Sequence, residues 1–287
     1  NSMKIGCLGF GEVGSKFANR LAEEGVSVSC HDPLIKRRKP AHPNITFVKF
    51  AEAVISSDFV LSMVTTDIAE SIATKAVKHL GDGQFYVDLN WTSPAKKRAI
   101  AQIVEESGAQ FVEGAIMEAM AAAGANARIL IGGAHMSYAA ETLTELGLNC
   151  EAYRENVGAA SLFKMLRSVF SKGVEAVLIE TLLAAELGGV REDIWAEIQR
   201  TFQNTPFEKM ARGWVTSHAS ACTRRRDEIA QVNDVVSNLG LKPKMCAAAS
   251  QVFESSVANG LNDAFNRPPE DMADVIEWLS LNQPKLA

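Results

Sequence analysis

The order of hydrophobic and polar positions divides the chain into two parts with different rhythms. Up to residue 155, short apolar runs alternate with amphipathic stretches, which is typical of a parallel, doubly wound sheet covered by helices. Strands are predicted at 4–10, 26–32, 58–64, 84–90, 109–114, 127–133 and 148–153. Helices are predicted at 11–25, 68–80 and 93–107. The first part should therefore fold as an α/β domain.

The pattern after residue 157 is helical throughout. Residues 158–189 contain no helix breaker except Gly173 before the closing pair of glycines, and they predict one helix of about 30 residues. Further helices are predicted around 191–203, 207–218, 220–239, 242–260 and 270–280. We therefore expect a sheet-containing domain over 3–156 and an all-α domain over 157–287.

Composition narrows the class of protein. The chain has 287 residues, 47% of them hydrophobic, which suits two domains better than one. The net charge is −5 and no long basic tract occurs, so we expect neither nucleic acid nor a membrane as partner. No apolar run approaches the roughly 20 residues that span a bilayer. The five cysteines form no C-x-x-C pair and the histidines are scattered, so we expect reduced thiols, a cytoplasmic location and no metal site.

A glycine motif near the start carries the first chemical information. It has the spacing G-x-G-x-x-G and reads Gly9-Phe10-Gly11-Glu12-Val13-Gly14. It follows a predicted strand directly and opens a predicted helix, which is the arrangement of a dinucleotide-binding loop. Free N–H groups at the helix start would face a pyrophosphate. The first part is thus predicted to be an α/β Rossmann domain.

The second strand ends at a residue that bears on the choice of dinucleotide. Asp32 lies about twenty residues beyond the motif, where a carboxylate accepts from a ribose hydroxyl and favours NAD. The basic cluster Lys36 to Lys39 is a solvated loop or a site for the 2′-phosphate of NADP. Both cofactors stay open, and we favour NAD.

A second candidate site lies at the end of the strand predicted at 84–90. Asn90, Trp91, Thr92 and Ser93 follow it, and ligands of open parallel sheets bind beyond the carboxyl ends of strands. The alternative is that Ser93 and Pro94 simply begin a helix. Both can hold together, and we expect the four residues to contact substrate.

A polar stripe runs along the start of the long helix. Ser161, Lys164, Ser168 and Ser171 fall at i, i+3, i+7 and i+10, so they share one helix face. This face is either solvated or turned toward a cleft. In a cleft, the ammonium of Lys164 could exchange a proton with a substrate hydroxyl.

These motifs together resemble the β-hydroxyacid dehydrogenases, the group of 3-hydroxyisobutyrate and 6-phosphogluconate dehydrogenases. GCLGFGEVGSKFANRLAEEGVSV is similar to their cofactor loop, VDLNWTSPAKK to their D-x-S-T-x-x-P substrate segment, and GAASLFKMLRSVF to their lysine helix. By this resemblance SMVTTD places Val64, Thr65 and Thr66 beside the nicotinamide, and Asn90 borders it too. The resemblance makes Lys164 the catalytic lysine.

The chain departs from that family where the substrate should bind. Met117-Glu118-Ala119 stands in place of the usual S-G-G, and Arg167 and Ser168 stand in place of asparagines. We therefore expect Met117, Glu118 and Ser168 to shape a different substrate pocket. The helical part resembles an uncharacterised domain that accompanies such cofactor domains in some bacterial proteins.

The resemblance implies an NAD(P)-dependent oxidoreductase that passes a hydride between nicotinamide and a small hydroxy acid or related alcohol or carbonyl compound. Two alternatives stay open: an imine reductase on the same frame, and a non-catalytic NAD(P)-binding sensor. The partner is expected to be a small-molecule substrate. The long apolar helix and the resemblance predict a homodimer formed through the helical domain.

Overall fold

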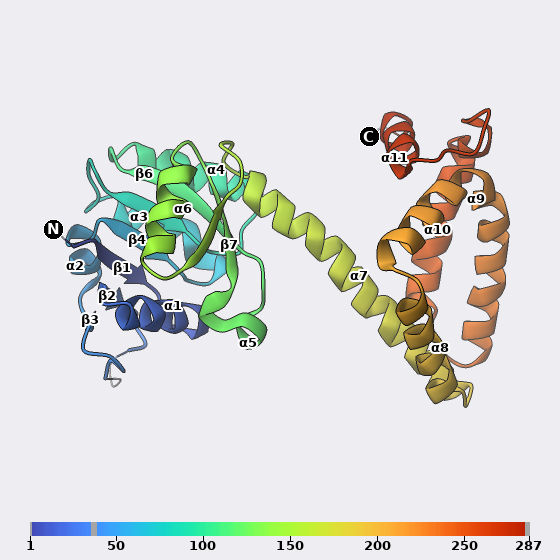
Figure 1. The fold of residues 1–287 in the computed structure, drawn as a ribbon, viewed down its shortest axis with the longest axis horizontal. Helices are drawn as coiled ribbons and strands as arrows, with labels where there is room; N and C mark the ends of the chain where they lie inside the picture. Colours follow the sequence, from blue (N-terminus) through green and yellow to red (C-terminus); the bar gives the residue numbers. More distant parts are fainter. Residues whose placement is uncertain (1, 36–38, 285–287) are drawn as a thin grey trace. The chain divides into compact units, whose positions relative to one another are not determined.

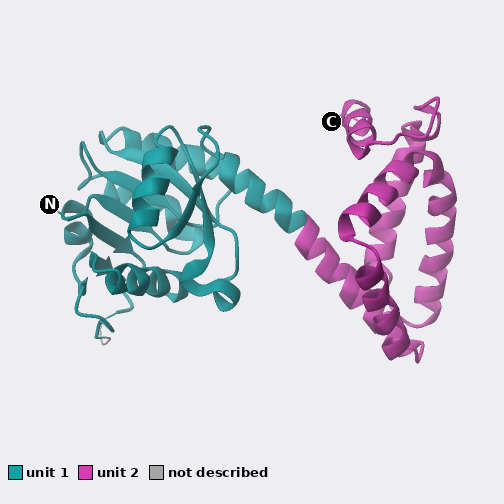
Figure 2. Ribbon diagram, viewed as in Figure 1, with its two compact units in different colours: residues 1–169 teal, residues 170–287 magenta. Residues whose placement is uncertain are grey.

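The computed structural model describes residues 2–35 and 39–284, which form two compact units. The first unit is Asn1–Val169 and the second is Phe170–Ala287 (Figure 2). The division falls inside helix α7 (Ala159–Leu187), so the first unit contains the beginning of this helix. The boundary expected from the sequence, between residues 156 and 157, lies thirteen residues earlier, just before α7 starts.

The first unit contains a sheet of eight strands. Their order is β3 (Ile45–Phe47), β2 (Ser27–His31), β1 (Lys4–Leu8), β4 (Phe59–Ser62), β5 (Phe85–Asp88), β6 (Gln110–Ile116), β7 (Arg128–Gly132) and β8 (Asn149–Ala152). All neighbours are parallel except β6 and β7. The predicted fold class is confirmed, although β7 runs against its neighbour and the three-residue β3 was not predicted, because it is too short to show a pattern.

Helices cover both faces of this sheet (Figure 1). The helices α1 (Glu12–Glu23) and α6 (Met136–Glu145) pack on one face together with strand residues such as Leu61 and Val87. The other face carries α2 (Phe50–Ile55), α3 (Ala69–Ala76) and α4 (Pro94–Glu105), packed on residues such as Val60 and Tyr86. Adjacent residues of a strand thus point into opposite cores, as the pleat requires. The chain between β6 and β7 holds the short helix α5 (Met120–Ala123).

The second unit is helical. Beyond the rest of α7 it contains α8 (Arg191–Asn204), α9 (Phe207–Asn238), α10 (Lys244–Ala258) and α11 (Met272–Leu281). The prediction of separate helices at 207–218 and 220–239 was wrong, because α9 is continuous. Ala219 and Cys222 lie at the expected break and are buried in the core of this unit with Leu261 and Val275. Within residues 2–35 and 39–284, no helix is both long and apolar enough to cross a membrane.

Candidate active site

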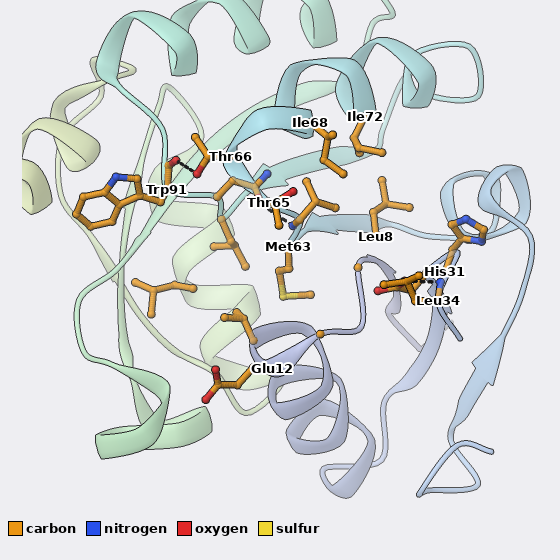
Figure 3. Close-up of a pocket in the computed structure, with 18 of the residues that line it drawn as sticks. Leu8, Glu12, His31, Leu34, Met63, Thr65, Thr66, Ile68, Ile72 and Trp91 are labelled. Atoms are coloured by element: carbon orange, nitrogen blue, oxygen red, sulfur yellow. Dashed lines mark hydrogen bonds between the residues drawn. The ribbon is translucent and has the colours of Figure 1, made fainter. Parts of the chain in front are cut away.

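A pocket of about 840 Å³ opens beyond the carboxyl ends of the central strands of the first unit. Its walls come from the loops after β1, β2, β4 and β5, from the segment after β6 and from the start of α7. Figure 3 shows Trp91 and Thr66 toward one end of the pocket and His31 and Leu34 toward the other. We call these the Trp91 end and the His31 end. The volume is typical of a small-molecule site.

The three glycines of the motif have separate roles in this pocket. Gly9 has a φ of +103°, and a Cβ there would lie 2.0 Å from the Met63 carbonyl oxygen, so only glycine fits. A Cβ on Gly14 would lie 2.3 Å from the Gly9 carbonyl oxygen, so α1 packs closely on the loop. Around Gly11, by contrast, no atom of the described residues beyond its own chain neighbours and the adjoining helix backbone lies within 4 Å of the Cβ position.

The space at Gly11 fits a pyrophosphate. Gly11 lines the pocket and is the N-cap of α1, and among the described residues no side chain caps its N–H groups. The free N–H groups and the helix dipole favour an anion at this point. Glu12 and Val13 line the same pocket. Phe10 does not, because its ring packs edge-on against Phe47 at a centroid distance of 5.0 Å.

Asp32 lies at the His31 end, directly after β2. Its Oδ2 accepts from the Phe10 N–H at 2.8 Å and its Oδ1 from the Leu34 N–H at 2.9 Å. Each carboxylate oxygen has further acceptor capacity, so the carboxylate can still accept from ribose hydroxyls. Of the basic cluster expected near it, Lys36, Arg37 and Arg38 lie outside the described residues.

The Asn90 side chain joins the loop after β5 to the end of β4 and the loop that follows it by two hydrogen bonds. Its side-chain oxygen accepts from the Val64 N–H at 2.7 Å, and its amide donates to the Ser62 hydroxyl at 2.9 Å. Asn90 is only 6% exposed. A second link joins the Thr66 hydroxyl to the Trp91 carbonyl oxygen at 2.6 Å. Val64, Thr65 and Thr66 line the pocket beside Asn90 and Trp91, and their contact with a nicotinamide stays a prediction.

Lys164 lies at the Trp91 end. It is half-buried, lines the pocket, and its Nζ lies 4.6 Å from the centroid of the Trp91 ring. Its pKa is lowered to about 8, first by burial and then by the positive charges of Lys97 and Arg167. The side chain thus faces the pocket, and both its charged and its neutral form are accessible near neutral pH.

Glu118 places a carboxylate in the same pocket. It accepts from the Arg128 N–H at 2.6 Å, and the Arg128 guanidinium lies 3.7 Å away. Met117, its neighbour, is 1% exposed and points into the protein. The Met117 carbonyl oxygen accepts from the Arg167 guanidinium. Of the two, only Glu118 lies where it can meet a ligand.

Three other residues expected to contact substrate lie outside the main pocket. Ser93 is the N-cap of α4 and accepts from the Lys96 N–H at 3.2 Å, so its helix-start role is confirmed. Thr92 is buried and lines a small cavity beside the pocket. The Ser168 hydroxyl donates to the Lys164 carbonyl oxygen at 3.1 Å. Their contact with substrate stays a prediction.

The sequence reading missed the residues that form the His31 end. They share an apolar or aromatic character and lie on α2, on α3, at strand ends and in the segments after β2 and β4: Leu8, His31, Leu34, Phe50, Ile68 and Ile72. Lys75 closes this end, with its ammonium 4.1 Å from the Phe50 ring centroid. The i, i+4 spacing of Ile68 and Ile72 was the available signal. Within the described part of the chain, no cluster of His, Cys, Asp or Glu could hold a metal ion.

Comparison with known families identifies the first unit. A family model described as the NAD binding domain of 6-phosphogluconate dehydrogenase matches residues 4–153, more than half of the 287 residues. The chain belongs to this family. A second family model, described as a domain of unknown function, matches residues 185–256 of the helical part. The resemblance inferred from the sequence motifs is thereby confirmed.

Two individual proteins resemble this 6-phosphogluconate dehydrogenase-like chain over most of its length. An uncharacterized 28.5 kDa protein of Methanothermus fervidus is 27% identical over 261 residues, covering 88% of this chain and 98% of that protein. A conserved protein of unknown function, described as structurally similar to 3-hydroxyacid dehydrogenases, is 30% identical, covers 91% of this chain and 100% of its own, and superposes with a TM-score of 0.59.

The fold is also shared with an imine reductase. The Myxococcus stipitatus enzyme in complex with NADP+ is 17% identical, covers 96% of this chain and 99% of its own, and gives a TM-score of 0.77. A variant of that enzyme was solved in complex with NAD+. The family match and the relative that is 30% identical support an NAD(P)-binding protein with a 3-hydroxyacid dehydrogenase-like fold.

Proposed function

We propose that the chain is an NAD(P)-dependent oxidoreductase that transfers a hydride between nicotinamide and a small hydroxy acid or related alcohol or carbonyl compound. The observation that carries the proposal is the position of Lys164, which faces the same pocket as the glycine motif. A binding loop alone would serve a sensor equally well. A half-buried amine opposite that loop is what a proton transfer requires.

The residues of the pocket support one direction for a bound dinucleotide. Gly11 and the start of α1 would hold the pyrophosphate, and Asp32 would accept from the adenosine ribose. This leaves the Trp91 end for the nicotinamide, bordered by Val64, Thr65 and Asn90. The bound cofactor supplies hydride transfer at its nicotinamide ring. The protein supplies placement and the proton.

Lys164 would act as general base in oxidation and as general acid in reduction. In oxidation, its neutral amine takes the proton of the substrate hydroxyl while the carbinol hydrogen leaves as hydride to the nicotinamide. In reduction, the ammonium returns that proton to the carbonyl oxygen. The pKa of about 8 suits both directions, because a group that titrates near the working pH gives and takes protons readily.

The substrate would not carry a carboxylate where the usual substrates of the family do. Glu118 lies in the pocket, where the S-G-G segment is expected to approach the substrate, and its negative charge repels an anion. The same carboxylate favours a cation, and this supports the second candidate. In that reading the substrate is a protonated imine, and the hydride reduces its C=N bond.

We also propose that two copies of the chain associate through the helical unit. Several large apolar side chains of α7 are exposed there: Phe170, Val174, Val177, Ile179, Leu183 and Leu187. An apolar stripe of this length is unusual on a monomer surface and typical of an interface. Light scattering tests this: the dimer predicts twice the 31.0 kDa of one chain, and a mass of one chain would rule it out.

A substrate panel tests the function directly. NAD and NADP would each be offered with hydroxy acids, polyols and simple alcohols, and their reduced forms with keto acids, ketones and cyclic imines. Turnover, followed by the absorbance of reduced nicotinamide, would identify the substrate class. Cofactor binding without turnover on any member would favour the sensor.

A further inference from the structure

A second lysine lies buried beneath the site and has no part in the proposed proton transfer. The Lys97 side chain, on α4, is 1% exposed. Its Nζ lies 2.8 Å from Asp88 Oδ1, and it donates to the Asp88 carbonyl oxygen at 2.8 Å and to the Gly114 carbonyl oxygen at 3.4 Å. Burying a charged ammonium is energetically unfavourable without such partners. The presence of a buried lysine at this position therefore needs an explanation.

The ion pair is connected to the loop that carries Trp91. Asp88 Oδ1 accepts from the Asn90 N–H at 3.0 Å as well as from Lys97. The Asn90 side-chain oxygen in turn accepts a hydrogen bond from the Val64 N–H. Asp88 Oδ2 is buried and has no hydrogen-bond partner among the described residues. The pair therefore organises the backbone at the Trp91 end without being exposed to the pocket.

The same lysine also shares a cavity with Lys164. Lys97, Lys164, Thr92, Gly114 and Ser161 line one small cavity between α4, β6 and α7. The Thr92 hydroxyl is buried there and finds no partner among the described residues. Little solvent screens one ammonium from the other across such a cavity, so their repulsion is stronger than between surface lysines.

The charges around Lys164 come from every neighbouring element. Glu12 on α1 and Glu118 after β6 line the same pocket. Asp88 on β5 faces Lys97, and Glu113 on β6 accepts from the Ala160 N–H at 2.8 Å.

Burial is the main cause of the lowered pKa of Lys164, and two positive charges lower that pKa further. These charges are Lys97 and Arg167. The Arg167 side chain donates to the Met117 carbonyl oxygen, but the residue is exposed overall, so water and salt screen its charge more than that of Lys97. Lys97 is the buried one, and its charge is fixed in place.

We propose that Lys97 is a positioning residue for the reaction: its buried ammonium, held by Asp88 behind Lys164, adds a fixed positive charge that favours release of the Lys164 proton. The catalytic consequence rests on the proposed function, whereas the effect on Lys164 itself does not. Lys97 touches neither substrate nor cofactor in this account. It acts through Lys164 and through the Asn90 loop.

Competitive labelling of lysines tests the inference without any substrate. Trace acetic anhydride would be applied to the folded chain between about pH 6 and pH 11, and the acetylated fraction of Lys164 read by peptide mass spectrometry. In the wild type, labelling should rise with a midpoint near the pKa of about 8. In K97M combined with D88N, which removes both charges but keeps an acceptor for the Asn90 N–H, the midpoint should move up by part of the gap to the ordinary lysine pKa of about 10.4, because burial of Lys164, the largest cause of its lowered pKa, is unchanged.

A neighbouring lysine provides the matched control. Lys96 is exposed and pairs with Glu70, so K96M should leave the Lys164 midpoint unchanged. If the double variant does not fold, K97Q carries the test, because its amide can still donate to Asp88 and the same upward shift is expected. An unchanged midpoint in a folded Lys97 variant would overturn the inference.

Once a substrate is known, turnover separates this inference from the proposed function. The pH midpoint of kcat/KM should move upward in the Lys97 variant together with the labelling midpoint. If the labelling midpoint moves and no substrate is ever turned over, the inference holds and the proposed function fails. If K164M abolishes turnover but Lys97 variants leave both midpoints in place, the proposed function holds and the inference fails.

Discussion

The ammonium nitrogen of Lys164 lies 4.6 Å from the centroid of the Trp91 ring. This contact joins the first turns of α7 to the loop after β5, two segments more than seventy positions apart in the sequence. Contacts of a cation with an indole face contribute about 0.5–2 kcal/mol. Here the contact also fixes where the amine lies, at the end of the pocket that we assign to the nicotinamide.

The pKa of Lys164 predicts opposite pH profiles for the two directions of the reaction. Oxidation needs the neutral amine, so its kcat/KM should rise as the pH increases through about 8. Reduction needs the ammonium, so its kcat/KM should fall through the same region. Initial rates in both directions across the pH range check this. Parallel profiles would show that another group carries the proton.

Two glycine substitutions should separate folding from cofactor binding. G11A adds a methyl group where the structure leaves space, so it should cost about 1 kcal/mol of stability or less. The same methyl group intrudes on the phosphate position and should weaken dinucleotide binding by roughly tenfold or more.

The matched variant G9A should behave differently. Its methyl group would lie 2.0 Å from the Met63 carbonyl oxygen at a φ of +103°, so it should destabilise the fold by more than about 1–3 kcal/mol. Thermal unfolding and cofactor titration together check the pair. A G11A variant with unchanged affinity would place the pyrophosphate elsewhere.

The charge of Glu118 should determine which substrates are rejected. E118Q keeps an oxygen that can accept from the Arg128 N–H and removes the negative charge. It should therefore bind anionic test compounds such as 3-hydroxyisobutyrate more tightly, with a lower KM, and bind cationic imines less tightly. Rapid turnover of 3-hydroxyisobutyrate by the unchanged protein would refute this account of the pocket.

The cofactor preference should follow Asp32. A carboxylate at this position accepts from both ribose hydroxyls and repels a 2′-phosphate, so NAD should bind more tightly than NADP. Replacing it in D32S should narrow or reverse the difference. Calorimetric titration of both cofactors measures this. Tighter binding of NADP by the unchanged protein would mean that the basic residues after Asp32 dominate.

The fold and the cofactor loop could be predicted because their signals are local. The spacing of Gly9, Gly11 and Gly14 reflects backbone geometry within one turn, and strand and helix periods repeat within a few residues. The antiparallel direction of β7 could not be foreseen, because nothing in a strand's own pattern records its orientation. The continuity of α9 was missed because burial of Ala219 and Cys222 depends on partners more than thirty residues away.

The candidate site was predictable only in part for the same reason. Lys164 and Trp91 were each singled out, but their contact depends on how α7 starts against the sheet. The sequence predicted no role for Lys97, because two adjacent lysines in the first turn of a helix are typical of an exposed helix surface. Only the structure shows that Lys96 faces solvent and Lys97 is buried against Asp88.

The most direct test of the account is the turnover of K164M on whichever substrate the panel identifies. Methionine keeps the apolar stem and removes the proton, so folding and dinucleotide affinity should stay close to those of the unchanged protein. We predict a loss of about 10²–10⁴-fold in kcat, with little rescue in K164R, because a guanidinium does not release its proton near neutral pH. Full turnover by K164M would contradict the account and make Lys164 a structural residue.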